Sequence, residues 1–253
     1  MINTKFHVYA LDVVYGQGKD GQIFEVDFKT PPEMYTDSSS KFIWPHWPHF
    51  QEIVLQKQYE CRGFDVEEGD VVVDIGANIG TFSRTALYKG ASEVYAFEPH
   101  PITFNCLMLN NGREIKFNGY NLAIGDSNGY VQLQVGRQDD QSFFPMGNTL
   151  NLYAPMYTQP VLINTMDMLF DSGLFEKIDF LKVDIEGAEY GMFKNLSDSN
   201  LRNINKIAIE YHPVLVTQGT DELKDRLNDQ SFEMVSSKPM YRNEVVFYKN
   251  KEF

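Results

Sequence analysis

Short apolar runs and helix-like segments alternate along the chain from residue 70 onward. Val71–Asp74, for example, is a short apolar strand of the kind that is buried in parallel sheets, and Thr81–Tyr88 follows it as a helix. The predicted strands are Val71–Asp74, Glu93–Phe97, Phe117–Ile124, Tyr130–Val135, Val161–Asn164, Ile178–Asp184, Lys206–Tyr211, Phe232–Val235 and Val245–Tyr248. The predicted helices are Thr81–Tyr88, Ile102–Asn110, Glu189–Leu196 and Thr220–Leu227. This order predicts an α/β fold with a doubly wound sheet and an antiparallel hairpin at one edge.

The residues before this region follow a different pattern. Phe6–Val14 and Ile23–Phe28 are predicted to form a β-hairpin, because the glycine-rich segment Gly16–Gly21 between them favours a turn. Apolar positions within Phe50–Arg62 predict a helix that leads into the α/β region. We therefore expect two parts, an N-terminal extension over residues 1–58 and a main domain over residues 59–253.

Composition favours a soluble protein with a substantial core. Apolar residues make up 43% of the chain, and 22 basic against 35 acidic residues give a net charge of −13. That charge disfavours a nucleic-acid partner, because phosphates would be repelled. The two cysteines, Cys61 and Cys106, fit a reducing compartment. Neither a signal-like start nor an apolar run of about 18 residues is visible, so we expect a cytoplasmic protein without a membrane segment.

A glycine-rich turn, Gly76–Gly80, lies between the first strand and the first helix of the main domain. In open parallel sheets, ligands bind beyond the carboxyl ends of the strands, and glycines let the backbone approach them closely. The next strand ends in Glu98, where a carboxylate could receive two ribose hydroxyls. A solvated strand end is the alternative interpretation of Glu98.

The spacing of this turn favours S-adenosylmethionine over a dinucleotide. Dinucleotide sites carry G-x-G-x-x-G, whereas this turn has G-x-x-x-G with Asn78 where a pyrophosphate would need space. Asp74, just before the turn, would repel a pyrophosphate. The same carboxylate would suit the cationic amino group of the methionine moiety.

Four segments together resemble the FkbM-type methyltransferase family: Asp74–Gly80, Phe97–Pro99, Leu122–Asp126 and Lys182–Glu189. The resemblance covers about Tyr59 to Tyr211. It implies a Rossmann-like class I methyltransferase fold for residues 59–253, S-adenosylmethionine as donor, and O-methylation of a sugar or natural product. The donor-binding residues that it implies, together with their neighbours at the strand ends, are Asp74, Gly76, Ala77, Asn78, Gly80, Glu98, Pro99, Ala123, Asp126, Asp184 and Glu186. For Asp126, a turn-forming role is an equal alternative.

Methyl transfer to a hydroxyl also requires that the hydroxyl lose a proton, to a general base or with the help of a metal. Two predicted neighbouring strands end in candidate groups, and the expected catalytic residues are Asp184, His212, Lys182 and Glu210. His212 is the favoured base because its pKa lies near neutrality. Alternatively, His212 packs over the strand end, and Glu186 or Glu189 caps a helix. A divalent ion held by Asp184 and Glu210 is a further hypothesis, which the spacing does not require.

Two segments could contact the acceptor. Trp44–His49 carries aromatic and imidazole rings that could stack on a sugar, or could instead anchor the extension. The long segment Gly136–Pro160 is predicted to be a loop that forms an acceptor wall or an ordinary surface loop. We expect a small-molecule or glycan acceptor and no nucleic-acid or membrane partner. A non-catalytic binding module, or methylation of a peptide or nucleic acid, are the alternatives, and the acceptor and the oligomeric state stay open.

Overall fold

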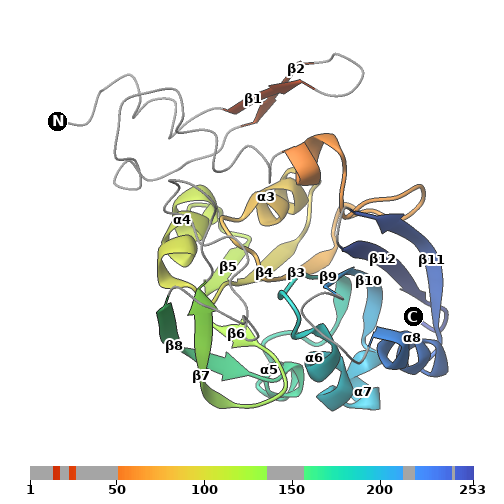
Figure 1. The fold of residues 1–253 in the computed structure, drawn as a ribbon. Coiled ribbons are helices and arrows are strands. Elements are labelled where there is room, and N and C mark those ends of the chain that lie inside the picture. Colours follow the sequence, from red (N-terminus) through yellow and green to blue (C-terminus); the bar gives the residue numbers. More distant parts are fainter. Residues whose placement is uncertain (1–13, 18–22, 27–50, 136–156, 213–219, 241–242) are drawn as a thin grey trace.

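A seven-stranded sheet forms the centre of the part of the chain that the structure describes (Figure 1). The computed structural model describes residues 14–17, 23–26, 51–135, 157–212, 220–240 and 243–253. The strand order is β11-β12-β10-β9-β3-β4-β5. The strands are β3 (Val71–Ile75), β4 (Glu93–Phe97), β5 (Phe117–Tyr120), β9 (Ile178–Val183), β10 (Ile204–Tyr211), β11 (Phe232–Pro239) and β12 (Glu244–Asn250).

Strand direction confirms the doubly wound α/β prediction. β5, β4, β3, β9 and β10 are mutually parallel, and β12 pairs antiparallel with both β10 and β11 at the edge. The chain runs outward from β3 through β4 to β5, then returns to the other side of β3 at β9. β3 and β9 are therefore the point at which the winding direction reverses, where open α/β sheets bind ligands.

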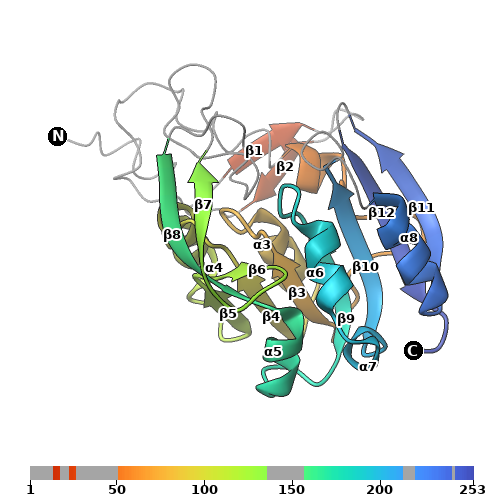
Figure 2. The same ribbon diagram turned by 60° about the horizontal axis from the view of Figure 1, so that its bottom comes forward.

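Helices cover both faces of this sheet (Figures 1 and 2). One face carries α3 (Thr81–Tyr88) and α4 (Pro101–Asn111), whose apolar side chains pack with Val72 and Phe180 of the sheet. The other carries α5 (Met166–Asp171), α6 (Glu189–Asn195), α7 (Asp198–Leu201) and α8 (Thr220–Asp229), which pack with Val73 and Ile75. Successive strand residues thus enter opposite cores, as a sheet buried on both faces requires. The described residues contain no helix that is both long and apolar enough to cross a membrane.

A second, three-stranded sheet corrects one strand prediction. The predicted strand Phe117–Ile124 is divided: β5 ends at Tyr120, and β6 (Ala123–Ile124) belongs to a sheet with the order β6-β8-β7. β7 is Gly129–Val135, and β8 is Tyr157–Asn164. The division lies at Asn121, whose side-chain amide donates to the carbonyls of Glu98 and Pro99 and so ties the turn to the end of β4. Since β8 begins at Tyr157, the last residues of the predicted loop 136–160 form a strand, and residues 136–156 lie outside the described ranges.

An N-terminal hairpin is present, and Val14, the last residue of the predicted first strand, begins its first strand. β1 (Val14–Gln17) pairs antiparallel with β2 (Ile23–Val26), while residues 6–13 and Trp44–His49 lie outside the described ranges. The predicted helix Phe50–Arg62 is wrong: only a π-helical turn, η3 (Gln51–Leu55), forms. The chain then bends so that Phe64 inserts under the sheet, with its ring 5.3 Å from that of Phe180 and 5.2 Å from that of Phe247. Burial of this ring overrides the local helical pattern.

Phe180 provides a test of this core. Its side chain is fully buried and contacts aromatic rings from residues 64 and 82. We expect Phe180→Ala to lower the free energy of unfolding by about 3–5 kcal/mol, because the aromatic contacts are lost and a cavity remains. Urea unfolding would measure this, with Ile115→Ala, at a 99% exposed site, as the control that should change little. Equal, small effects of the two substitutions would contradict the assigned packing.

Candidate active site

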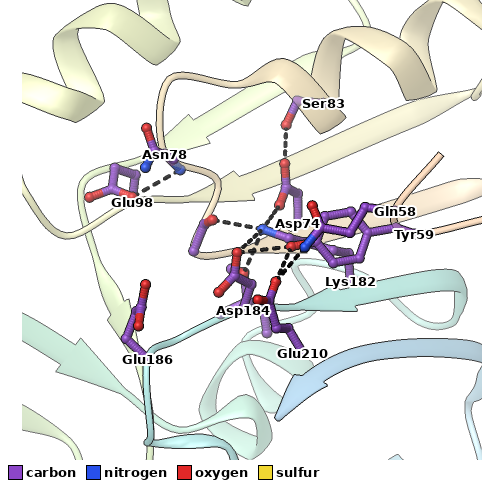
Figure 3. A network of polar contacts seen from close by, with 12 residues as sticks. Gln58, Tyr59, Asp74, Asn78, Ser83, Glu98, Lys182, Asp184, Glu186 and Glu210 are labelled. Atoms are coloured by element: carbon purple, nitrogen blue, oxygen red, sulfur yellow. Dashed lines mark hydrogen bonds and ion pairs between the residues drawn. The ribbon is translucent and has the colours of Figure 1, made fainter. Parts of the chain in front are cut away.

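A cavity of about 300 Å³ opens at the carboxyl ends of β3, β4, β9 and β10. On the β3–β4 side its wall includes Gly76, Asn78 and Glu98, and on the β9–β10 side it includes Asp184 and Glu210. Figure 3 shows Asn78 and Glu98 apart from the carboxylates of Asp184 and Glu210, which lie close to each other. The cavity therefore has two chemically different halves, which we call the β3–β4 half and the β9–β10 half.

The glycine turn is fixed by close backbone packing. Gly76 has a φ of +71°, and a Cβ there would lie 1.7 Å from the carbonyl oxygen of Asp184 on the neighbouring strand. Gly80 has a φ of +88°, and its Cβ would lie 2.2 Å from the Asn111 side chain on α4. Of these two glycines, Gly76 lines the cavity and Gly80 does not. Gly80, predicted to contact the donor, instead lets α3 pack closely against α4.

The carboxylate of Glu98 lies at the end of β4, as predicted, and forms part of the cavity wall. Its Oε2 accepts a hydrogen bond from the backbone N–H of Asn78 (3.0 Å), and its Oε1 accepts one from that of His100 (2.8 Å). Burial raises the pKa of Glu98 to about 7 despite these two bonds. Each carboxylate oxygen keeps a second lone pair, so the group can still accept hydrogen bonds from a ligand. Of the other predicted donor contacts, Ala77, Pro99, Ala123 and Glu186 also line the cavity.

Asp74 does not have its predicted place in the cavity wall. Its side chain is fully buried, with Oδ2 accepting a hydrogen bond from Ser83 (2.7 Å) and Oδ1 lying 3.1 Å from Nζ of Lys182. A carboxylate without exposure to water needs such a partner, and the lysine opposite it on β9 supplies the charge. Asp126 is also absent from the wall: it is exposed on the turn after β6, which fits its turn-forming interpretation.

Lys182 joins the two halves of the cavity. Its Nζ donates to the carbonyl oxygen of Gly76 (2.7 Å) and lies 3.7 Å from Asp184. Burial would lower the pKa of Lys182, but the charges of Asp74 and Asp184 raise it above its usual value. The ammonium therefore holds the glycine turn against β9. These contacts fit a positioning role for Lys182, and its predicted catalytic role stays a prediction.

Two residues at the predicted boundary between the N-terminal extension and the main domain, Gln58 and Tyr59, organise the β9–β10 half. The hydroxyl of Tyr59 lies 2.9 Å from Oδ2 of Asp184 and 2.8 Å from Oε2 of Glu210, and Gln58 donates to the same oxygen of Glu210 (2.7 Å). Asn243, next to β12, donates to Oε1 of Glu210 (2.9 Å). None of these three residues was among the predicted site residues, because no sequence motif contains them. The only signal was the start of the family resemblance at Tyr59.

His212 is surrounded by carboxylates and does not reach the cavity wall. Its Nδ1 lies 2.8 Å from Glu189, while its Nε2 lies 3.4 Å from Glu186, 3.7 Å from Asp184 and 3.8 Å from Glu210. Burial alone would lower the pKa of His212, but the hydrogen bond with Glu189 and the surrounding carboxylates raise it to about 10. Carboxylates on both sides of the ring favour its protonated form, which disfavours His212 as a general base, and that role stays a prediction.

Glu186 and Glu189, either of which could cap a helix by sequence, have different surroundings in the structure. Glu189 accepts a hydrogen bond from the N–H of Gly187 (3.1 Å) and is buried in the first turn of α6, but no side chain caps the N-terminus of this helix. Glu186 has a φ of +52° and lines the cavity. Burial, followed by the charge of Asp184, raises its pKa to about 7. A non-glycine residue in this backbone region is uncommon and is often found at functional sites.

Residues 74–234 match the family model described as the methyltransferase FkbM domain. The chain is 32% identical over 154 residues to the hexuronic acid methyltransferase AglP of Haloferax volcanii, covering 58% of each protein. It is 26% identical over 193 residues to the 31-O-demethyl-FK506 methyltransferase FkbM of Streptomyces tacrolimicus, covering 65% of this chain and 74% of that one. A solved structure of FkbM from Methylobacillus flagellatus KT aligns with a TM-score of 0.49 and 15% identity, over 74% of this chain and 44% of that one.

The buried ion pair between Asp74 and Lys182 leads to a prediction about the stability of the protein. We expect Asp74→Asn to lower the free energy of unfolding by about 3–5 kcal/mol, because Lys182 would stay buried without its main counter-charge. Lys182→Met should cost a similar amount, and the double variant should cost less than the sum of the two. Urea unfolding would measure these values, with Asp171→Asn on the exposed end of α5 as the charge-matched control. Additive losses would rule out the pairing.

Proposed function

This chain belongs to the methyltransferase FkbM domain family, whose members are S-adenosylmethionine-dependent methyltransferases, and from this premise we propose that it O-methylates a sugar, glycan or small natural product. The observation that carries the proposal is that one cavity is lined by the Gly76 turn and Glu98 as well as by the carboxylates of Asp184 and Glu210. The relatives named for hexuronic acid and for 31-O-demethyl-FK506 support this acceptor class. The net charge of −13 favours such an acceptor over a polyanion. The cytoplasmic location stays a prediction from the sequence.

The β3–β4 half of the cavity fits the methyl donor. The missing side chain at Gly76 leaves the backbone of the turn accessible, and the buried Glu98 has lone pairs left for the two ribose hydroxyls. Apolar wall residues, among them Pro99, Leu122 and Ala123, provide a surface for the adenine. When bound, S-adenosylmethionine supplies a methyl group activated by attachment to a positively charged sulfur.

The β9–β10 half is where we place the acceptor. Asp184 and Glu210 line this half, and Tyr59 holds both carboxylates in position. A hydroxyl in contact with these carboxylates can lose its proton to the acidic cluster as its oxygen bonds to the methyl carbon and the sulfur–methyl bond breaks. The two halves meet across the β3–β9 pair, so the protein contributes chiefly by fixing the distance and direction between donor and acceptor.

The test is product formation from the purified chain. Incubation with S-adenosylmethionine carrying a deuterated methyl group and a panel of glycosides and hydroxylated natural products should give, by mass spectrometry, a product heavier by one labelled methyl group. Parallel calorimetry should show that S-adenosylmethionine binds. Absence of any donor binding would overturn the proposed function, because each acceptor class depends on it.

Glu98 should make donor binding depend on pH. Because the pKa of Glu98 is about 7, its carboxylate becomes charged as the pH rises from about 6 to about 8. The charged carboxylate is a stronger acceptor for the ribose hydroxyls, so the affinity of the protein for the donor should rise by roughly tenfold. Glu98→Gln should remove most of this rise and weaken binding at the higher pH by about tenfold. Calorimetric titration with S-adenosylhomocysteine would measure both, with Glu176→Gln at an exposed site as the control. An affinity that falls with pH in the unaltered protein would exclude this role of Glu98.

A further inference from the structure

We propose that Asp184 and Glu210, which line the β9–β10 half of the cavity, form a binding site for a divalent cation together with the buried His212 beside them. One potential ligand atom from each residue lies within 4.8 Å of the other two. Asp184 and His212 directly follow the adjacent parallel strands β9 and β10, and Glu210 lies near the end of β10, so the sheet itself sets their spacing. Two carboxylates and one imidazole, next to a cavity that leaves room for water or acceptor oxygens, match the preferences of Mn²⁺ and Mg²⁺-type ions.

The orientation of His212 is the first support. Its imidazole is 4% exposed, and Nδ1 is held by the buried carboxylate of Glu189. A carboxylate on one ring nitrogen is the arrangement that orients metal-bound histidines in proteins. Nε2 forms no hydrogen bond with any described residue, and it faces carboxylate oxygens of three residues at 3.4–3.8 Å. The nitrogen therefore lies close enough to Asp184 and Glu210 for the three residues to share one ion.

The balance of charge is the second support. Four carboxylates, from Asp184, Glu186, Glu189 and Glu210, surround the single imidazole. The nearby ammonium of Lys182 is closer to Asp74 (3.1 Å) than to Asp184 (3.7 Å). A group of carboxylates next to a largely enclosed imidazole favours the binding of positive charge. A divalent cation supplies it, and on binding it releases the proton from the imidazole nitrogen that becomes a ligand.

The surroundings of the two carboxylates are the third support. Gln58 and Asn243 donate to the two oxygens of Glu210 at 2.7 and 2.9 Å, and the Tyr59 hydroxyl holds Asp184. Such outer hydrogen bonds fix the direction of ligating oxygens. They come from residues before β3 and next to β12, so distant parts of the chain converge on these carboxylates (Figure 3).

The binding of the cation stands on this geometry alone, whereas its catalytic use rests on the proposed function. A bound cation would contact the acceptor oxygen and lower the pKa of that hydroxyl. The hydroxyl proton would pass to the carboxylate of Glu186, which lines the same cavity without belonging to the three ligands. The acceptor oxygen would then bond to the methyl carbon as the sulfur–methyl bond breaks, which leaves S-adenosylhomocysteine.

Mn²⁺ titrated into the purified full chain, without donor or acceptor, tests the site. We expect electron paramagnetic resonance to show one tightly bound Mn²⁺ per chain, and spin-echo modulation to show one directly bound nitrogen. Glu210→Gln and His212→Gln should each weaken Mn²⁺ binding by more than about tenfold, and Glu189→Gln, which removes only the orienting carboxylate, by about 10–100-fold. The control Glu176→Gln should bind as the unaltered protein does.

Two results would overturn the site: no stoichiometric Mn²⁺ binding to a chain that still binds S-adenosylhomocysteine, or binding that persists in Glu210→Gln and His212→Gln. The nitrogen signal is read from the unaltered protein, so its absence counts against His212 as a ligand even if a variant fails to fold. Mn²⁺ binding that is lost in these variants would support the site even if no acceptor were ever methylated, which separates this inference from the proposed function.

Discussion

The buried ion pair between Asp74 and Lys182 holds the two halves of the active site at a fixed spacing. The two residues are direct partners in the register of β3 and β9, at the point where the winding of the sheet reverses. Because the lysine also donates to the carbonyl of Gly76, it fixes the turn that begins the β3–β4 half. Gly76 in turn packs so closely on the backbone of Asp184 that no side chain fits between them. Backbone contacts and one enclosed pair of charges therefore set the distance across which a methyl group would move.

The same pairing leaves the β9–β10 half acidic. Since Lys182 is directed at Asp74 and Gly76, it offers little compensation to Asp184 and none by direct contact to Glu210. The protein stabilises these carboxylates with neutral donors, including Tyr59 and Gln58, and with the imidazole of His212. An acidic surface held by neutral donors is well suited to bind positive charge or to take up a proton. Both proposals follow from this one electrostatic feature.

The residues that shape the β9–β10 half come partly from outside the segment that matches the family. The match begins at residue 74, whereas Gln58 and Tyr59 precede it and Asn243 follows its end at residue 234. The β3–β4 half is built entirely within the match, from the Gly76 turn and Glu98. The two halves of the cavity therefore differ in how far they are built from the segment that matches the family.

Sequence alone determined the strand–helix order, the doubly wound sheet, the glycine turn and the family. Each of these features depends on local patterns of apolar residues, glycines and short motifs. It placed Glu98, Asp184 and Glu210 at strand ends, and all three line the cavity. It could not decide that Asp74 faces Lys182, that Gly80 serves helix packing, or that His212 is enclosed by acids. Those outcomes depend on which side chains meet across neighbouring strands. Burial in a shared, water-poor interior, which only the tertiary structure creates, decides whether a charged group binds a ligand or a partner within the protein.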